Sequence, residues 1–373
     1  MSVLPRTTDL FVIGGGPAGL ATAIAARRRG LDVTLADSAT PPIDKACGEG
    51  LMPDGLAAAR SLGLDLSPAG GHPFRGIRFC DADSNAAVEA DFPQDFGLGL
   101  RRTALHQLML EHANACGVRL AWGARVCGIT PQGVQLSDRF VNARWIAGAD
   151  GGHSPVRRWA GLDASHHKSR RFGFRRHYAV APWTEYMEIH WGAGCQLYVT
   201  PIGEGEVCVV LISRDQRLRL EDALPRFPEM ERRLAHAGPA NLQRGGVTTT
   251  RRLKSVCRGN VALVGDASGS VDAITGEGLC LLFQQAAALA DALHAGDLSL
   301  YQDAHRRIGR RPEWMADLML LLDRRGGIRS RALRAFAQRP ALFKGMLAMH
   351  VGEFSAADVF TNSLSLGWRM LTL

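Results

Sequence analysis

The stretch DLFVIGGGPAGLATAIAARRRGLDVTLAD, from Asp9 to Asp37, decides the fold class of this chain. The apolar run 9–13 predicts a buried strand, the glycines after it predict a tight turn, the alanine-rich segment 18–29 predicts a helix, and 31–36 predicts a second buried strand. A strand, a helix and a second strand in this order form a βαβ unit, whose strands run parallel. The chain is therefore expected to have an α/β fold.

The turn of this unit carries a glycine pattern that suits a dinucleotide. Gly14, Gly16 and Gly19 form GxGxxG, in which the first glycine permits the turn, the second lets backbone approach a pyrophosphate, and the third lets the helix pack on the strand. Asp37 ends the second strand, where its carboxylate can accept hydrogen bonds from ribose hydroxyls and would repel a 2′-phosphate. The unit indicates a Rossmann-type site for FAD or NAD rather than NADP.

A second segment, GNVALVGDASGSVDAITGEGL at 259–279, favours FAD over NAD. Asp266 directly follows a predicted buried strand, so its carboxylate can bond a ribityl hydroxyl. Gly276 and Gly278 open a predicted helix, whose N-terminus is positive and would stabilise an anionic reduced flavin.

The remaining sequence alternates between strand and helix signals. A helix is predicted at 105–117, and short strands at 119–122, 134–136 and 145–147. Between 172 and 212, alternating aromatic-rich runs predict an antiparallel sheet. A strand at 261–264 precedes a long helix at 278–294, and helices dominate from there to the C-terminus, including the tail 358–373.

Three motifs, GGGPAGL (14–20), GADGGHSPVRR (148–158) and VGDASGSVDAITGEGL (264–279), carry a family resemblance. In order and spacing they resemble the fingerprints of the FAD-dependent oxidoreductase superfamily that contains aromatic-ring hydroxylases (group A flavoprotein monooxygenases) and geranylgeranyl reductases. The resemblance covers about residues 9–300. It implies FAD as the cofactor and NAD(P)H as a transient electron donor.

The resemblance also implies a domain plan. A discontinuous FAD-binding domain of Rossmann type would comprise 1–80, 100–165 and 250–300. It would interleave with an antiparallel-sheet substrate domain at 80–100 and 165–250, and a helical region would follow at 300–373.

The same resemblance assigns cofactor-binding residues. Arg102 would reach the pyrophosphate or the flavin, Val126 would touch adenine through its backbone, and Asp150 would lie near the pyrophosphate. The full set expected to bind FAD is Gly14, Gly16, Pro17, Ala18, Gly19, Asp37, Ser38, Lys45, Cys47, Gly48, Arg102, Val126, Asp150, Asp266, Gly276, Gly278 and Leu279.

The motifs leave two branches of the superfamily open. The segment DKACGEGLMP (44–53) resembles the CGxG loop of the reductases, and Gly269 stands where hydroxylases commonly have histidine. One feature argues against the reductases: QLYVTP (196–201) keeps only part of their YxWxFP motif. Halogenases share the fold, but their WxWxIP motif is missing from this sequence. We favour a monooxygenase that hydroxylates a lipophilic phenolic or polyketide-type substrate through a C4a-hydroperoxyflavin. The alternatives are a reductase that saturates alkene bonds of a prenyl or other lipophilic substrate, and a non-catalytic flavin-binding protein.

Catalytic residues are harder to assign, because the cofactor carries most of the chemistry. His190 and Tyr198, on the predicted substrate sheet, are candidates to orient or deprotonate a phenol. Cys47 is a candidate redox or substrate-facing thiol. The eight cysteines show no CxxC pair and no His/Cys ligand spacing, so neither a disulfide framework nor a metal site is expected.

Composition and charge limit the partners. With 46% hydrophobic and 21% charged residues, the 373-residue chain resembles an ordinary globular enzyme, not a disordered or coiled-coil protein. Its net charge of +8 is concentrated between His305 and Lys344, where eleven Arg and Lys face three acids. We expect a cytoplasmic protein whose basic C-terminal helices contact membrane surfaces, with no nucleic-acid partner, because no nucleic-acid-binding motif accompanies the charge.

Overall fold

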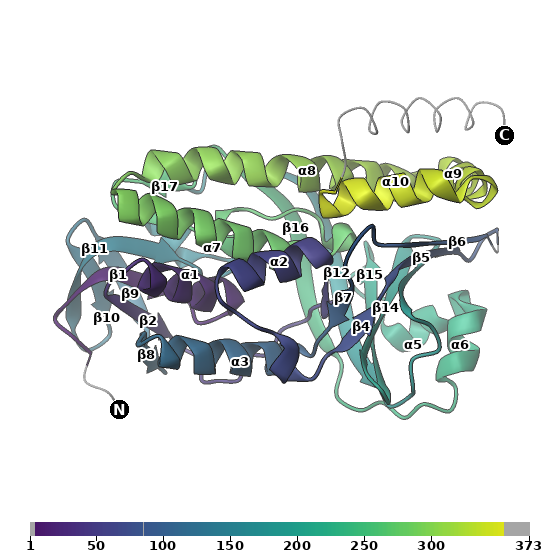
Figure 1. Cartoon of the computed structure of the whole chain (residues 1–373), viewed down its shortest axis with the longest axis horizontal. Coiled ribbons are helices and arrows are strands. Elements are labelled where there is room, and N and C mark those ends of the chain that lie inside the picture. Colours follow the sequence, from purple (N-terminus) through teal and green to yellow (C-terminus); the bar gives the residue numbers. More distant parts are fainter. Residues whose placement is uncertain (1–3, 85, 354–373) are drawn as a thin grey trace.

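The computed structural model describes residues 4–84 and 86–353. Two large sheets lie beside each other, and a layer of long helices runs along one side of both (Figure 1). The predicted α/β fold, with a Rossmann-type part, a second sheet and C-terminal helices, is confirmed.

The first sheet is built around β1 (Thr7–Ile13), which pairs in parallel with β2 (Val33–Asp37) and β11 (Phe140–Gly148). Ile13 lies opposite both Ala36 and Gly148, so the three strands end at the same edge. Helix α1 (Pro17–Arg28) begins at that edge, as the glycine pattern predicts. The sheet is completed by β8 (Arg119–Trp122), β9 (Val126–Thr130), β10 (Gly133–Leu136), β17 (Cys257–Arg258) and β18 (Val261–Leu263).

The second sheet has seven strands and is mostly antiparallel. Across the sheet they are β16 (Arg244–Leu253), β12 (Ser165–Tyr178), β15 (Glu206–Ser213), β14 (Cys195–Gly203), β13 (Tyr186–Gly192), β5 (Gly76–Asp81) and β6 (Ala87–Asp91). The strands of the predicted run 172–212 pair antiparallel, whereas β5, which lies outside that run, pairs in parallel with β13. The reason is topological: β5 comes from a segment about a hundred residues earlier, and strands joined by a long crossover can run parallel.

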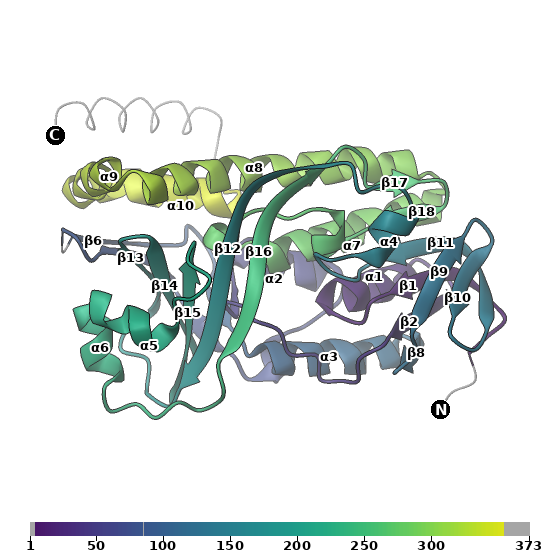
Figure 2. The ribbon, with the colours of Figure 1, turned by 180° about the vertical axis from the view of Figure 1, so that it is seen from behind.

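Smaller elements join the two sheets. A three-stranded sheet of β3 (Gly50–Leu51), β7 (Gly97–Gly99) and β4 (His72–Phe74) lies next to helix α2 (Pro53–Ser61). Long strands β12 and β16 run from the second sheet towards the first (Figure 2). The other short helices are α4 (Pro155–Trp159), α5 (Leu220–Ala223) and α6 (Pro228–Leu234).

Long helices close the molecule. Helices α3 (Arg102–Ala115) and α7 (Gly278–Ala295) pack against α1, and α8 (Leu298–Arg324) packs along α7. Helices α9 (Gly326–Gln338) and α10 (Pro340–Val351) cover β6 of the second sheet. Helix thus continues to Val351 as predicted, and the tail 358–373 lies outside the described residues. The two sheets and the helical layer meet in one region, and the residues there come from all three parts.

Candidate cofactor and substrate site

A large cavity lies where the two sheets meet. It has a volume of about 350 Å³. Its walls come from the turn before α1, the segment 45–50, the loop after β11, the segment after β18 and the start of α7. Cavities at the carboxyl ends of parallel strands are the usual ligand sites of open α/β sheets.

The glycine turn leaves backbone open to this cavity. A Cβ on Gly16 would meet no atom within 4 Å, whereas a Cβ on Gly19 would overlap the carbonyl oxygen of Gly14. Gly14 has φ +111°, a conformation that side chains rarely adopt. Gly16, Pro17 and Ala18 line the cavity. Two glycines therefore serve the fold, and Gly16 leaves room for a ligand at a helix N-terminus.

Asp37 is tied to the same turn. Its Oδ2 accepts a hydrogen bond from the Gly15 amide (2.6 Å), and its Oδ1 accepts one from the Ala39 amide (2.8 Å). Asp37, the exposed Ser38 and Val126 on β9 are not part of the described cavity lining. Their predicted contacts with the ribose and adenine remain predictions.

Asp266 lines the cavity together with the glycine turn. Its side chain is exposed to the cavity, but the surrounding protein removes it from bulk water. This desolvation raises the pKa of its carboxyl, while Arg102 and Lys45 lower it. Gly276, Gly278 and Leu279 at the start of α7 also line the cavity. Two cations, one acid and two helix N-termini facing one space form a donor and acceptor set that fits a dinucleotide.

Asp150 lies just outside the lining, between Ala149 and Gly151, which are part of it. Its Oδ2 accepts the Val156 amide at 3.0 Å, and Oδ1 is buried without a hydrogen-bond partner. Burial raises the pKa of this carboxyl. The side chain therefore holds the start of α4 and leaves one oxygen unused.

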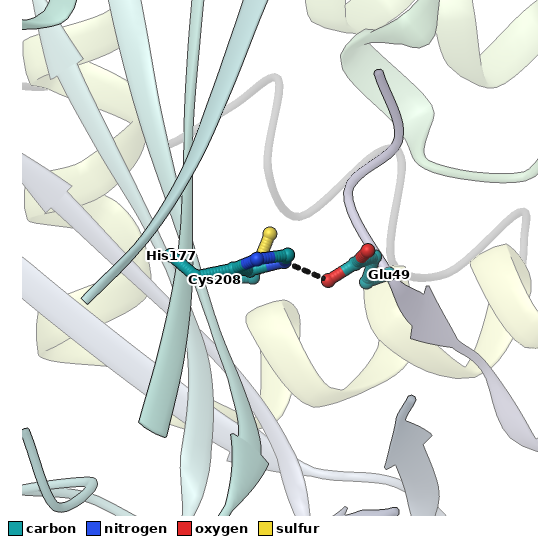
Figure 3. Close-up of side chains that lie close together, drawn as sticks. All are labelled: Glu49, His177 and Cys208. Carbon is teal, nitrogen blue, oxygen red and sulfur yellow. Dashed lines mark hydrogen bonds and ion pairs between the residues drawn. The ribbon is translucent and has the colours of Figure 1, made fainter. Parts of the chain in front are cut away.

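The segment 44–50 forms one wall of the cavity and is fixed by buried charges. Glu49 is 1% exposed and adopts φ +59°, which is rare for a residue with a side chain. Its Oε1 accepts hydrogen bonds from Arg175 Nη1 (2.8 Å) and the Arg102 amide (3.0 Å), and its Oε2 lies 2.6 Å from His177 Nε2. Figure 3 shows His177 and Glu49 pointing at each other, with the Cys208 thiol beside the ring.

Hydrogen bonding assigns the proton on His177. The Asn241 amide nitrogen contacts Nδ1 of His177, and because an amide nitrogen only donates, Nδ1 accepts and Nε2 donates to Glu49. Burial alone would raise the pKa of Glu49, but the bonds to His177 and Arg175 outweigh it and lower the pKa. Arg175 also forms a bidentate pair with Asp44, at 3.0 and 2.9 Å. The wall is thus an electrostatically satisfied unit.

Cys47 and Gly48 are carried on this wall and line the cavity together with Lys45. The Glu49 amide lies 3.4 Å from Cys47 Sγ, and Thr200 donates to the Gly48 carbonyl at 2.8 Å. Cys47 is therefore one of two catalytic candidates that line the cavity, the other being Tyr198.

Tyr198 and His190 are placed differently. Tyr198 lines the cavity, but its hydroxyl donates to the Ile274 carbonyl at 2.9 Å, and burial raises the pKa of the phenol. His190 is a correction, because strand alternation turns it away: Met187 and Ile189 face the apolar pocket described below, while His190 lies on the opposite face with Glu188, at 3.2 Å. Burial lowers the pKa of His190, but bonds with Cys80 and Glu188 raise it to about 9.

A narrow apolar pocket adjoins the cavity and shares Met187 and Tyr198 with it. It lies between the second sheet and helices α8 and α10. Its other walls are Met52, Ile77, Phe79, Ile189, Ile274, Thr275, Met315, Met319, Phe343, Met346, Leu347 and His350.

Two clusters bring together side chains of metal-binding type that the sequence spacing did not suggest. They are Glu49, His177 and Cys208, and Cys80, Glu188 and His190. In the first, Arg175 occupies the carboxylate, which disfavours a cation. His350 was also not singled out, because an isolated histidine in a late helix gives no sequence signal.

This combination of Rossmann-type sheet, open glycine turn and cavity acid defines an FAD-binding oxidoreductase. The chain belongs to the FAD binding domain family, whose model matches residues 7–219.

Relatives of both predicted branches are similar to this chain. Menaquinone reductase of Mycobacterium tuberculosis is 29% identical over 79% of this chain and 78% of its own length. Rifampicin monooxygenase of Streptomyces venezuelae is 27% identical over 74% of this chain and 62% of its own length. A flavoprotein/dehydrogenase structure from Cytophaga hutchinsonii has a TM-score of 0.84 at 14% identity, covering 98% of both chains, and supports the fold. FAD as cofactor and the oxidoreductase class are thereby confirmed.

Proposed function

We propose that this FAD-dependent oxidoreductase takes electrons from NAD(P)H and hydroxylates a lipophilic small molecule. The observation that carries the proposal is the apolar pocket, which adjoins the cofactor cavity and shares two wall residues with it, Met187 and Tyr198. An apolar group held there would lie next to the cofactor and away from water. Such a position suits oxygen transfer, in which the protein mainly positions the substrate and excludes solvent.

The cavity residues would hold FAD by backbone and charge. The open backbone at Gly16 and the N-terminus of α1 would receive the pyrophosphate, with Lys45 and Arg102 nearby. The Asp266 carboxylate would accept a hydrogen bond from a ribityl hydroxyl, and the N-terminus of α7 would face the flavin ring. Bound FAD supplies the electron transfer and oxygen chemistry.

Alkene reduction is the second candidate, and Cys47 favours it. Its thiol lines the cavity on a rigid wall, and a reductase needs a proton donor near the alkene carbon that does not receive hydride. The similarity to menaquinone reductase, named for a lipophilic quinone, supports the same branch. The proline of the reductase motif is kept at Pro201, but Tyr198 and Thr200 replace its aromatic residues.

One experiment separates the two reactions. The purified holoenzyme is reduced anaerobically with NADH or NADPH and then given oxygen together with 1-naphthol, or geraniol as an alkene, and products are identified by mass. Gain of an oxygen atom in the naphthol supports hydroxylation. If geraniol gains two hydrogen atoms and no oxygen atom, hydroxylation is overturned in favour of alkene reduction. Failure of both nicotinamides to bleach the flavin overturns the assigned electron donor.

We further propose peripheral contact of a cytoplasmic protein with anionic membranes. Of the eleven basic residues between 305 and 344, Arg329 is buried in an ion pair with Asp81 and Arg311 is half-buried against Asp54, and the other nine are exposed. Trp314 and Leu321 on α8 are also exposed. Among the described residues, no helix has both the length and the apolar character needed to cross a bilayer.

Sedimentation with phosphatidylserine vesicles tests this contact. Salt-sensitive co-sedimentation that weakens when Arg307, Arg310 and Arg324 are replaced by Gln supports it. Absence of binding at low ionic strength overturns it.

A further inference from the structure

The apolar pocket has one polar corner. Three of its lining side chains carry polar groups, namely Tyr198, Thr275 and His350. The Tyr198 hydroxyl donates to the Ile274 carbonyl (2.9 Å), and the Thr275 hydroxyl donates to the Asp272 carbonyl (3.3 Å). His350 differs, because its Nδ1 is buried and finds no hydrogen-bond partner in the part of the chain that the structure describes. Both hydroxyls have given their proton to a carbonyl and can still only accept, so the imidazole is the side chain of these three with a buried ring nitrogen left unpaired among the described residues.

Glu277 lies behind this imidazole and is also unsatisfied. It is 2% exposed, and within residues 4–84 and 86–353 neither carboxyl oxygen has a hydrogen-bond partner. Oε2 lies 4.0 Å from His350 Nδ1, and Oε1 lies 3.7 Å from Arg311 Nη2. Arg311 makes its short bond, 2.6 Å, to Asp54 instead. Burial raises the pKa of Glu277, although His350 and Arg311 lower it.

Buried polar groups without partners are uncommon in native proteins and call for an explanation. Here one of them, the His350 imidazole, lines an otherwise apolar pocket, and the other, the Glu277 carboxyl, lies 4.0 Å from its Nδ1. A carboxyl at Nδ1 fixes the orientation and tautomer of an imidazole, which leaves the other ring nitrogen for a second partner.

We propose that His350, positioned by Glu277, recognises a single hydroxyl or carbonyl group on an otherwise apolar substrate. This inference rests on the proposed function, since it assumes that the substrate enters the apolar pocket. The substrate class is a hydrophobic ring or chain with one oxygen substituent at its buried end. His350 would contact the substrate, and Glu277 would act through His350.

The walls of the apolar pocket suit a ligand whose binding requires the side chains to rearrange. The space is narrow, about 30 Å³, so a ring can enter only when side chains move. Methionine is flexible and polarisable and adapts to such ligands. Half of the ten methionines of the chain gather here: Met52, Met187, Met315, Met319 and Met346.

The test compares binding of 1-naphthol and naphthalene to the FAD-loaded full chain by equilibrium dialysis. These probes share an apolar body and differ in one hydroxyl. We expect naphthol to bind about tenfold more tightly, the effect of one hydrogen bond to a buried group. Glu277→Leu and His350→Leu should abolish the preference, while Glu277→Gln, whose amide can still bond the imidazole, should keep part of it.

Met319→Leu is the matched control, because it alters the same pocket without touching the polar corner. It should change the affinity for both probes alike and leave their ratio unchanged. FAD content and thermal unfolding of each variant show whether it is folded.

Equal binding of the two probes, or a preference that survives His350→Leu, overturns this inference and leaves the lipophilic site intact. Binding of neither probe overturns the proposed function as well.

Discussion

Glu49 and Glu277 are both buried glutamates close to the cofactor cavity, but they differ in hydrogen bonding and in the direction in which their pKa is shifted. Glu49 has partners for both oxygens, from Arg175, His177 and a backbone amide, and its pKa is lowered. Glu277 has no hydrogen bond to any residue that the structure describes, and burial raises its pKa. Around Glu49, the described protein groups satisfy the buried carboxylate, and we call this a completed region. Around Glu277, hydrogen-bonding positions are left for another partner, and we call this an open region.

The same contrast occurs in the glycine turn. Gly19 is packed against Gly14, so its missing side chain serves the fold. Gly16 faces empty space, so its missing side chain serves whatever fills the cavity. Regions that the chain completes are expected to control stability, and regions that it leaves open are expected to control binding.

Breaking the completed region should have the largest effect. Arg175→Met would leave Glu49 and Asp44 without their buried partner, and we expect a loss of about 3–5 kcal/mol in the free energy of unfolding. Urea unfolding of the purified protein measures it. Arg244→Met is the matched control: Arg244 also pairs with Asp44, at 3.3 Å, but is 58% exposed, so its loss should cost under about 1 kcal/mol. Equal losses in the two variants would contradict the contrast.

A third buried carboxylate, Glu188, also pairs with another buried side chain, His190. Its contribution to the free energy of unfolding should depend on pH. The pKa of its partner His190 is raised to about 9, above the ordinary value of about 6.5. The stability from this pair is therefore complete below about pH 6.5 and is lost as pH rises through about 9, by up to about 3 kcal/mol.

Unfolding free energies measured across this range should show the alkaline loss in the natural chain and a weaker one in His190→Asn. An unchanged pH slope in the variant would show that His190 is not the group responsible.

The open region of the turn should respond in binding instead. Gly16 has φ −71° and ψ 177°, which any residue adopts, so Gly16→Val should fold. Its side chain would occupy the pyrophosphate position and weaken FAD binding by about 2 kcal/mol or more, roughly thirtyfold. Flavin titration of the apoprotein measures this change. Gly19→Ala should instead lower the stability of the apoprotein, and full FAD occupancy of the Gly16 variant would refute the placement of the cofactor.

The smallest effect on stability is expected at Glu277. Glu277→Gln removes a carboxyl that forms only long ion pairs, to Arg311 at 3.7 Å and His350 at 4.0 Å, so the free energy of unfolding at neutral pH should change by less than about 1 kcal/mol. Glu49→Gln, which breaks a complete cluster, should cost more in the same urea experiment. A larger loss at Glu277 than at Glu49 would mean that Glu277 has a structural role.

The sequence by itself determined the fold class and the cofactor. The segment 9–37 predicts the βαβ unit because helix, strand and turn signals are local and follow one another directly. The positions of Gly16 and Asp266 in the cavity follow from the same logic, since each comes at the end of a parallel strand.

Only the tertiary structure decided which side chains meet. Arg175 and His177 reach Glu49 across more than 120 residues, and His350 lies near Glu277 because α10 packs over the pocket. His190 has a residue type suited to catalysis, yet it faces away because a one-residue step along a strand reverses the face. Such contacts depend on distant segments and on side-chain direction, neither of which leaves a local signal in the sequence.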